Sequence, residues 1–212
     1  MRNRWLAAVL LACPALCLAG DVTSIALPAP QKDGGKPLMQ VLNERKTARE
    51  FSPDKLPLQV LSNLLWAAWG VNRPDGHRTA PSASNHQEID VYVAQADGLY
   101  LYDPKDHRLQ GVLPDDLRAA TGTQPFVGTA GLNLVYVADY TKMGNSPEDD
   151  KRFYSGADTG FIAQNVYLFC ASQGLNTVVR ASVDRAALAK AMHLRPEQHI
   201  VLAQTVGSPP KK

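Results

Sequence analysis

The side chains best suited to hold a charged ligand gather in one short run, Glu44-Arg-Lys-Thr-Ala-Arg49-Glu50. Apolar residues at helical spacing precede this run, and they predict a first helix over Leu38–Arg49. Arg45 and Arg49 would then share one helix face, where like charges repel by about a few tenths of a kcal/mol. An anion between them would remove the repulsion, and the planar guanidinium fork suits a phosphate group. A solvated basic helix end, which is favourable to the helix dipole, explains the same run without any ligand.

Side-chain amides and hydroxyls form two further groups of candidate ligand contacts. The turn Arg78-Thr-Ala-Pro81-Ser-Ala-Ser84-Asn85 offers an Asn amide, whose donor and acceptor match the edge of a heteroaromatic ring. An ordinary Asx or proline turn accounts for the same residues without a ligand. In Gly160-Phe-Ile-Ala-Gln164-Asn165 two amides fall within an apolar helix, so each needs a hydrogen-bond partner if it is buried.

Several familiar site patterns are missing from the 212 residues. There is no Gly-x-Gly-x-x-Gly, no phosphate loop, no Gly-x-Ser-x-Gly and no Cys-x-x-Cys, so the enzyme classes that depend on them are not favoured. The 5 histidines include no pair at the short spacing typical of metal ligands, so no metal site is predicted. The net charge of +2 is too small to indicate that the protein binds nucleic acid.

The N-terminus has the pattern of an export signal. The basic stretch Met1–Trp5 precedes an apolar run, Leu6–Ala19, which is shorter than the ~20 residues that a membrane-spanning helix requires. Small residues at the end of this run predict cleavage after Ala19. Residues 1–19 are therefore interpreted as a signal peptide, and the mature protein as periplasmic or secreted without a transmembrane segment. A lipoprotein box ending at Cys13 is the alternative, and it predicts export as well.

Cleavage would leave a formally neutral chain with one cysteine, Cys170, in an oxidising compartment. Cys170 lies in an apolar run, and we interpret it as a small buried hydrophobic residue rather than a nucleophile. The mature chain divides into a leading segment rich in Pro and Gly, residues 20–36, and one domain over residues 37–212.

The elements that must position these residues alternate between helices and strands, which indicates an α+β or α/β protein. A helix over Leu58–Trp69 lies between Pro57 and Gly70, the usual start and stop residues, and its apolar residues all round predict burial on more than one side. Thr141–Asp158 has no periodicity and is interpreted as a long charged loop. The other expected elements are strands over Ile89–Ala94, Leu99–Tyr102, Leu132–Ala138, Thr177–Val179 and Ile200–Val206, with Asp97-Gly98 as a hairpin turn, and helices over Gly160–Ser172 and Asp184–Met192.

The sequence contains six motifs in this order: Glu44-Arg-Lys-Thr-Ala-Arg49-Glu-Phe51, Pro81-Ser-Ala-Ser-Asn85, Leu101-Tyr-Asp-Pro104, Gly160-x-x-x-Gln164-Asn165-x-Tyr-Leu168, Gly174-Leu-Asn-Thr177 and Val206-Gly207-x-Pro. Together they resemble the nitroreductase family of flavin enzymes, specifically its branch of SagB-type dehydrogenases, over nearly all of the mature chain. The resemblance implies an α+β fold in which helices flank a central, mostly antiparallel sheet. It also implies a homodimer that packs through long apolar helices and holds FMN at its interface.

The resemblance assigns the phosphate end of FMN to the basic run. Arg45 and Arg49, with Lys46 and Thr47 between them, would hold the phosphate and the ribityl chain. Lys211 would add a further positive charge to the same site.

The ring end of FMN is assigned to two other segments. Asn85, with Ser82 or Ser84, would meet the polar edge of the flavin ring. The segment Arg180-Ala181-Ser182, after the short strand, corresponds to the place where a backbone N–H approaches the flavin N5 atom. A donor there, and a cation near the opposite edge of the ring, would stabilise the reduced flavin.

The resemblance does not extend to a specific reaction. Members of the SagB-type branch that oxidise azolines carry a Lys-Tyr pair upstream of the Gln-Asn helix, and this sequence has no such dipeptide; Lys151-Arg-Phe-Tyr154 is the nearest approximation. No catalytic residue is assigned, because Tyr154 and Arg180 are candidates by position alone.

The expected function is an exported FMN-dependent oxidoreductase that uses a two-step flavin cycle on an unidentified small molecule or peptide. One substrate would reduce FMN and another would reoxidise it. No pool of NAD(P)H exists outside the cytoplasm, so the reductant is left open. The alternatives are a non-enzymatic member that keeps the fold to bind a flavin or similar ligand, and a structural envelope protein whose apolar helices serve only dimer assembly.

Overall fold

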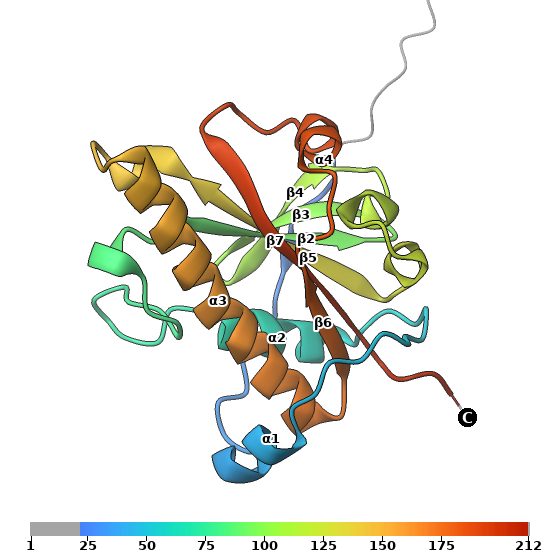
Figure 1. Cartoon of the computed structure of the whole chain (residues 1–212). Helices are drawn as coiled ribbons and strands as arrows, with labels where there is room; N and C mark the ends of the chain where they lie inside the picture. Colours follow the sequence, from blue (N-terminus) through green and yellow to red (C-terminus); the bar gives the residue numbers. More distant parts are fainter. Residues whose placement is uncertain (1–21, 212) are drawn as a thin grey trace, which may run out of the picture.

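A seven-stranded sheet forms the centre of the molecule (Figure 1). The computed structural model describes residues 22–211, so the predicted signal peptide and Cys13 lie outside the described residues. Neighbouring strands pair antiparallel throughout, in the order β1-β4-β3-β2-β5-β7-β6, which confirms the α+β class and the central antiparallel sheet. The strands are β1 Ile25–Ala26, β2 Ile89–Gln95, β3 Gly98–Asp103, β4 Arg108–Leu113, β5 Leu132–Asp139, β6 Asn176–Arg180 and β7 Gln198–Gly207.

Both faces of the sheet are covered. Successive side chains of a strand point to opposite faces, so Val91 and Val93 of β2 join one core while Tyr92 and Ala94 join another. The first core includes α2 (Leu58–Trp69) and α3 (Glu148–Gln173), and the second includes Leu188 of α4 (Arg185–Ala191). Every residue of β5 is buried, as expected for a strand with covered faces and paired edges.

The helix α2 was predicted correctly and is buried on more than one side. Pro57 precedes its first residue and Gly70 follows its last. It packs against α3 and shares one core with it and the sheet, and its Trp69 Nε1 donates a hydrogen bond to Ile89 O at the start of β2 (2.8 Å). The helix α4 was also predicted, and its Asp184 side chain accepts a hydrogen bond from Ala187 N (3.0 Å), the expected N-cap.

The structure corrects two predictions of secondary structure. The first helix, α1, covers Leu38–Glu44 rather than Leu38–Arg49. The predicted loop Thr141–Asp158 is mostly helical, because α3 begins at Glu148 after a short 3-10 turn, η4, at Tyr140–Met143. Its charged first turn lacks an apolar period, yet acidic residues there interact favourably with the helix dipole.

Two strands were not expected from the sequence. Strand β4 has little alternation of polar and apolar residues and is defined by its pairing with β3. Strand β1, within the Pro- and Gly-rich leading segment, pairs with β4 at one edge of the sheet. None of the helices in residues 22–211 combines the length and the apolar character needed to cross a membrane.

Candidate functional site

The basic run lies in an extended segment rather than on a helix. After α1 ends at Glu44, residues 45–50 run beside the edge strand β6, and the Ala48 N–H donates a hydrogen bond to Thr177 O (3.1 Å). Arg45 and Arg49 therefore do not stand one turn apart on a helix face, and the argument from their repulsion within a helix was wrong. Pairing with a sheet edge over long sequence separation overrides the local helical pattern.

Tyr167 of α3 fixes this segment against the sheet. Its hydroxyl accepts a hydrogen bond from Val179 N of β6 (3.0 Å) and lies 3.0 Å from Thr47 Oγ1. The Arg45 guanidinium carbon lies 5.3 Å from the centre of the same ring, within the range of a cation–π contact. The sequence reasoning named the Tyr only as part of a motif and gave it no role.

Four of the five residues assigned to the phosphate end line one hollow of about 600 Å³. These are Lys46, Thr47, Arg49 and Lys211, and Glu50 is the only acidic residue among those that line it. The fifth, Arg45, contacts the ring of Tyr167 on the same segment. The structure thus brings the predicted phosphate-binding residues to one place and concentrates positive charge there.

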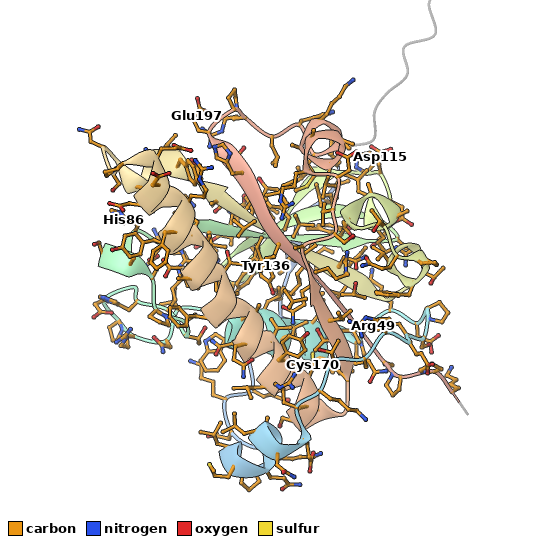
Figure 2. All side chains as sticks on the ribbon, viewed as in Figure 1. Arg49, His86, Asp115, Tyr136, Cys170 and Glu197 are labelled. Carbon is orange, nitrogen blue, oxygen red and sulfur yellow. The ribbon has the colours of Figure 1, made fainter. Side chains whose placement is uncertain are left out.

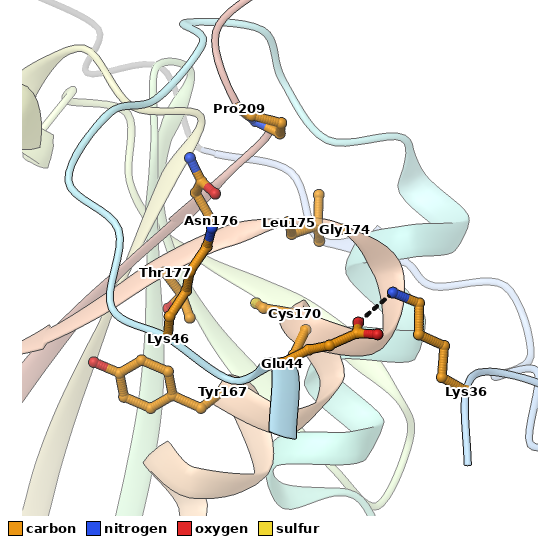
Figure 3. A pocket seen from close by; sticks show the side chains of 11 residues that line it. Lys36, Glu44, Lys46, Tyr167, Cys170, Gly174, Leu175, Asn176, Thr177 and Pro209 are labelled. Carbon is orange, nitrogen blue, oxygen red and sulfur yellow. Dashed lines mark hydrogen bonds and ion pairs between the residues drawn. The ribbon is translucent and has the colours of Figure 1, made fainter. Parts of the chain in front are cut away.

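An adjoining pocket of about 530 Å³ extends this hollow towards α1 and α3 (Figure 3). Lys46 and Asn176 line both spaces. Cys170 lines the second pocket but is buried, and burial raises the pKa of its thiol above the ordinary value, so the thiol stays protonated. This agrees with the expectation of a buried hydrophobic residue.

The turn that carries Asn85 lies on the other side of α3. In Figure 2 the labelled His86, the next residue in the chain, and Arg49 stand on opposite sides of this helix. The turn contains a short 3-10 helix, η1 (Ala83–Asn85), in which Ser84 and Asn85 have positive φ angles of 50° and 54°. Ser82 and Asn85 line a pocket of about 220 Å³, whereas Ser84 does not. This pocket and the hollow at Arg49 share no lining residue within one chain.

Two buried carboxyl groups lie beneath this turn. Asp158 of α3 accepts a hydrogen bond from Ala83 N (2.9 Å), and Glu88, which is fully buried, lies beside it. Burial raises the pKa of both carboxyl groups, and their mutual repulsion adds to the effect at Glu88. Asp158 therefore anchors the turn to α3 through its hydrogen bond to Ala83, a feature that no sequence pattern had indicated.

The segment at the end of β6 places its predicted residues at the surface. Ala181 and Ser182 are exposed, and Ser182 is tied to Thr123, with 2.7 Å between the two hydroxyl oxygens. Arg180 points inward and is only 5% exposed, so its guanidinium does not reach the surface. Tyr154 is exposed on α3 beside Phe153.

The two amides of α3 have different environments. Gln164 is exposed and needs no protein partner. Asn165 is half-buried and donates a hydrogen bond to Ala67 O of α2 (3.1 Å), which joins the two helices. The expectation that a buried amide in this helix needs a hydrogen-bond partner is therefore met at Asn165.

Comparison with known proteins identifies a family and two similar proteins. The profile described as "Nitroreductase family" matches residues 42–208. A nitroreductase-like protein of Methanocaldococcus jannaschii is 33% identical over 169 residues, which cover 75% of this chain and 84% of that protein. A crystal structure of a protein described as a nitroreductase from Ralstonia eutropha JMP134 is 45% identical, with a TM-score of 0.86 and 97% of each chain covered.

More distant structures share the fold alone. One, from Desulfovibrio desulfuricans, is described as a nitroreductase in complex with FMN; it is 21% identical, with a TM-score of 0.61 over 84% of this chain and 89% of that one. Another is a chain of the Escherichia coli microcin synthetase McbBCD complex, 20% identical, with a TM-score of 0.68 over 99% of this chain and 85% of that one.

Proposed function

The chain belongs to the nitroreductase family of oxidoreductases, and on this premise we propose that it binds FMN and works as an exported oxidoreductase on a small molecule or peptide. The carrying observation is the hollow beside β6, in which Lys46, Arg49 and Lys211 face one acidic residue. The finer placement in the SagB-type branch remains a prediction from the sequence motifs.

The residues of the hollow fit the phosphate end of a flavin nucleotide. Among the described residues, no carboxylate lies within 4.0 Å of the charged groups of Arg45, Lys46 or Arg49. Lys211 has one exposed partner, Asp54, at 3.0 Å. The cations of Arg45, Lys46 and Arg49 are therefore available for charge-assisted hydrogen bonds to a phosphate.

The ring end requires a second copy of the chain. Within one chain, Ser82 and Asn85 line a pocket separate from the hollow, so we propose a homodimer in which the turn of one copy reaches the hollow of the other. Large apolar side chains exposed on α1 and α3 support such an interface. They are Leu38, Met39, Leu42, Phe153 and Phe161.

Bound FMN would supply the electron and hydride transfer, and this chain would bind and orient it. Arg45 and Arg49 would hold the phosphate, and Asn85 would offer a donor and an acceptor to the ring edge. Ala181 and Ser182, which directly follow β6, are exposed residues. No acid or base is assigned, and the reductant and the acceptor stay open for an enzyme proposed to act outside the cytoplasm.

Titration of FMN into the purified protein, followed by its fluorescence, tests the proposal. The wild-type protein should bind FMN and be yellow. The double substitution Arg45→Ala and Arg49→Ala should weaken binding at least about 10-fold, because it removes charge-assisted hydrogen bonds that each contribute ~1.5–3 kcal/mol. Arg152→Ala is the matched control, since Arg152 is an exposed arginine of α3. Equal affinity in the double variant and the control would refute the assignment of the phosphate site.

Anaerobic titration with electron donors separates the proposed enzyme from the alternatives. An enzyme should show loss of the oxidised flavin spectrum with at least one donor. Bound FMN that no donor reduces would identify the non-enzymatic binding member instead. A protein that dimerises but binds no flavin would identify the structural role.

A further inference from the structure

The pocket at Asn85 contains a guanidinium that is held in place but has no carboxylate partner. The plane of the Trp69 ring system supports Arg78, whose guanidinium carbon lies 4.6 Å from the ring centre. Arg78 Nε donates a hydrogen bond to Gln87 Oε1 (2.7 Å). In the described part of the chain, its two terminal nitrogens have no hydrogen-bond acceptor, and no carboxylate lies within 4.0 Å.

Gln87 links the polar residues that line this pocket. Its Nε2 donates to Asn85 Oδ1 (2.9 Å) and to Gly76 O (3.1 Å), and its backbone N–H donates to Ser82 Oγ (2.8 Å). The side-chain oxygen of Gln87 accepts the hydrogen bond from Arg78 Nε. The fork of Arg78 is therefore oriented before any ligand arrives, which reduces the entropy lost on binding.

The charges around the pocket favour an anion. Arg73 and His77 line it together with Arg78, and none of the lining residues is acidic. Asp75 lies beside His77, with 2.9 Å between Nδ1 and Oδ1. Burial lowers the pKa of Arg78 below its ordinary value, but a guanidinium remains charged at neutral pH.

The two acids whose charges act on Arg78, Asp90 and Asp103, already have cationic partners. Asp90 lies 2.6 Å from Lys142 Nζ, and Asp103 lies 3.4 Å from Arg108 Nε. Neither pairs directly with Arg78, so its charge is not matched by a contact in the described residues. Burying a charge that has neither an opposite charge nor enough hydrogen-bond acceptors is unfavourable, and an anionic ligand would supply both to Arg78.

We propose that this pocket binds the carboxylate of a small acidic substrate, with the two terminal nitrogens of Arg78 as the paired donors. The assignment rests on the proposed function, because Ser82 and Asn85 of the same pocket are the residues expected at the flavin ring. Arg78 fits a carboxylate through two parallel hydrogen bonds, a geometry that lysine cannot provide. The volume of about 220 Å³ restricts the occupant to a small group.

Calorimetric titration with benzoate and with benzamide tests the assignment. The two probes have nearly the same shape, but only benzoate carries a charge. Wild-type protein loaded with FMN should bind benzoate at least about 10-fold more tightly than benzamide, and Arg78→Met should abolish this preference. Arg78→Lys, which keeps the charge without the fork, should retain part of it. Arg152→Met is the matched control and should leave both affinities unchanged.

The same variants distinguish the substrate from the cofactor as the source of the anion. FMN affinity should be within about 2-fold of wild type in Arg78→Lys, while benzoate binding falls. If Arg78→Lys and Arg78→Met weaken FMN binding and leave benzoate binding intact, the pocket serves the cofactor and the proposal is wrong. Equal binding of benzoate and benzamide to the wild-type protein overturns it without any variant. Benzoate binding that depends on Arg78 in a protein that never binds FMN would support the pocket and refute the proposed function.

Discussion

Arg78, which is half-buried, and Arg180, which is buried, both lack a carboxylate partner within 4.0 Å among the described residues, yet they have different surroundings. Arg180 is 5% exposed, and its terminal nitrogens donate to Thr121 O (2.7 Å), Asn133 Oδ1 (3.1 Å) and Thr205 Oγ1 (2.9 Å). Arg78 has one protein acceptor and opens on a pocket. The fold supplies acceptors for both terminal nitrogens of Arg180, whereas the terminal nitrogens of Arg78 remain available to a ligand.

The surroundings of Arg180 show how the fold accommodates a buried cation. Its acceptors come from β5, β7 and the 3-10 helix η2 (Arg118–Thr121), so one side chain joins three elements to β6. Gly122 leaves room for it, because a Cβ there would lie 1.9 Å from Arg180 Nη1. Desolvation lowers the pKa of Arg180 to about 10, which still leaves it charged at neutral pH. Burial without a counter-ion therefore identifies a functional arginine only where a pocket is also present.

The largest expected effect follows from removing the buried cation. Arg180→Met should lower the free energy of unfolding by ~3 kcal/mol, because it leaves three buried acceptors without their charged donor. Urea denaturation followed by circular dichroism measures this, with the exposed Arg152→Met as control. Benzoate affinity should not change. An unfolding free energy equal to that of wild type would show that the acceptors find other partners. Arg180 would then not stabilise the fold, and it would not differ from Arg78 in this respect.

A smaller effect is expected at the carboxyl pair, which differs from both arginines because burial raises its pKa values into a range where the pair can gain or lose protons with pH. The pKa values of Glu88 and Asp158 are raised, so the folded state binds their protons more tightly than the unfolded state. This stabilisation is fully present below the ordinary carboxyl pKa and is lost as the pH rises through the raised values. Glu88→Gln cannot ionise and should therefore be more stable than wild type at high pH, by about 1 kcal/mol or more, and similar to it at low pH.

Thermal unfolding between about pH 4 and pH 9 measures this difference. The exposed Asp150→Asn on α3 is the control and should follow the wild-type profile. His86 on the same turn and Tyr140 of η4 are the other ionisable groups near the pair. A stability difference that is constant over the whole pH range would indicate that Glu88 does not hold a proton in the fold.

The smallest expected effect is at Gln87, which lines the pocket and orients Arg78 but is not one of the proposed donors to the carboxylate. Gln87→Ala removes the charge-assisted hydrogen bond from Arg78 Nε and the amide bonds to Asn85 and Gly76, but leaves the terminal nitrogens of Arg78 in place. Benzoate should therefore bind about 2- to 10-fold more weakly while the preference over benzamide remains. Calorimetry with both probes measures the two quantities. Loss of the preference itself would mean that Gln87, rather than Arg78, selects the charge.

Several elements could be predicted because their signals are local. Proline and glycine define the ends of α2, Asp184 caps α4, and alternation shows β2, β3, β5 and β7. The basic segment was also recognisable by residue type, although its conformation was not, since the pairing of Ala48 with Thr177 spans a long stretch of chain. The same limit explains why β4 was missed, because only its partner β3 defines it.

The sequence by itself determined the family, the antiparallel α+β sheet and the residues that gather at the proposed phosphate site, because each depends on residue types in a fixed order. Only the tertiary structure decided which arginine faces a pocket, which one has its terminal nitrogens bound by protein acceptors, and that burial raises the pKa values of two carboxyl groups. Solvent exposure and the identity of hydrogen-bond partners depend on segments distant in sequence: Asp158 meets Ala83, and Arg180 meets Thr121, only after the chain has folded. No spacing along the chain carries that information.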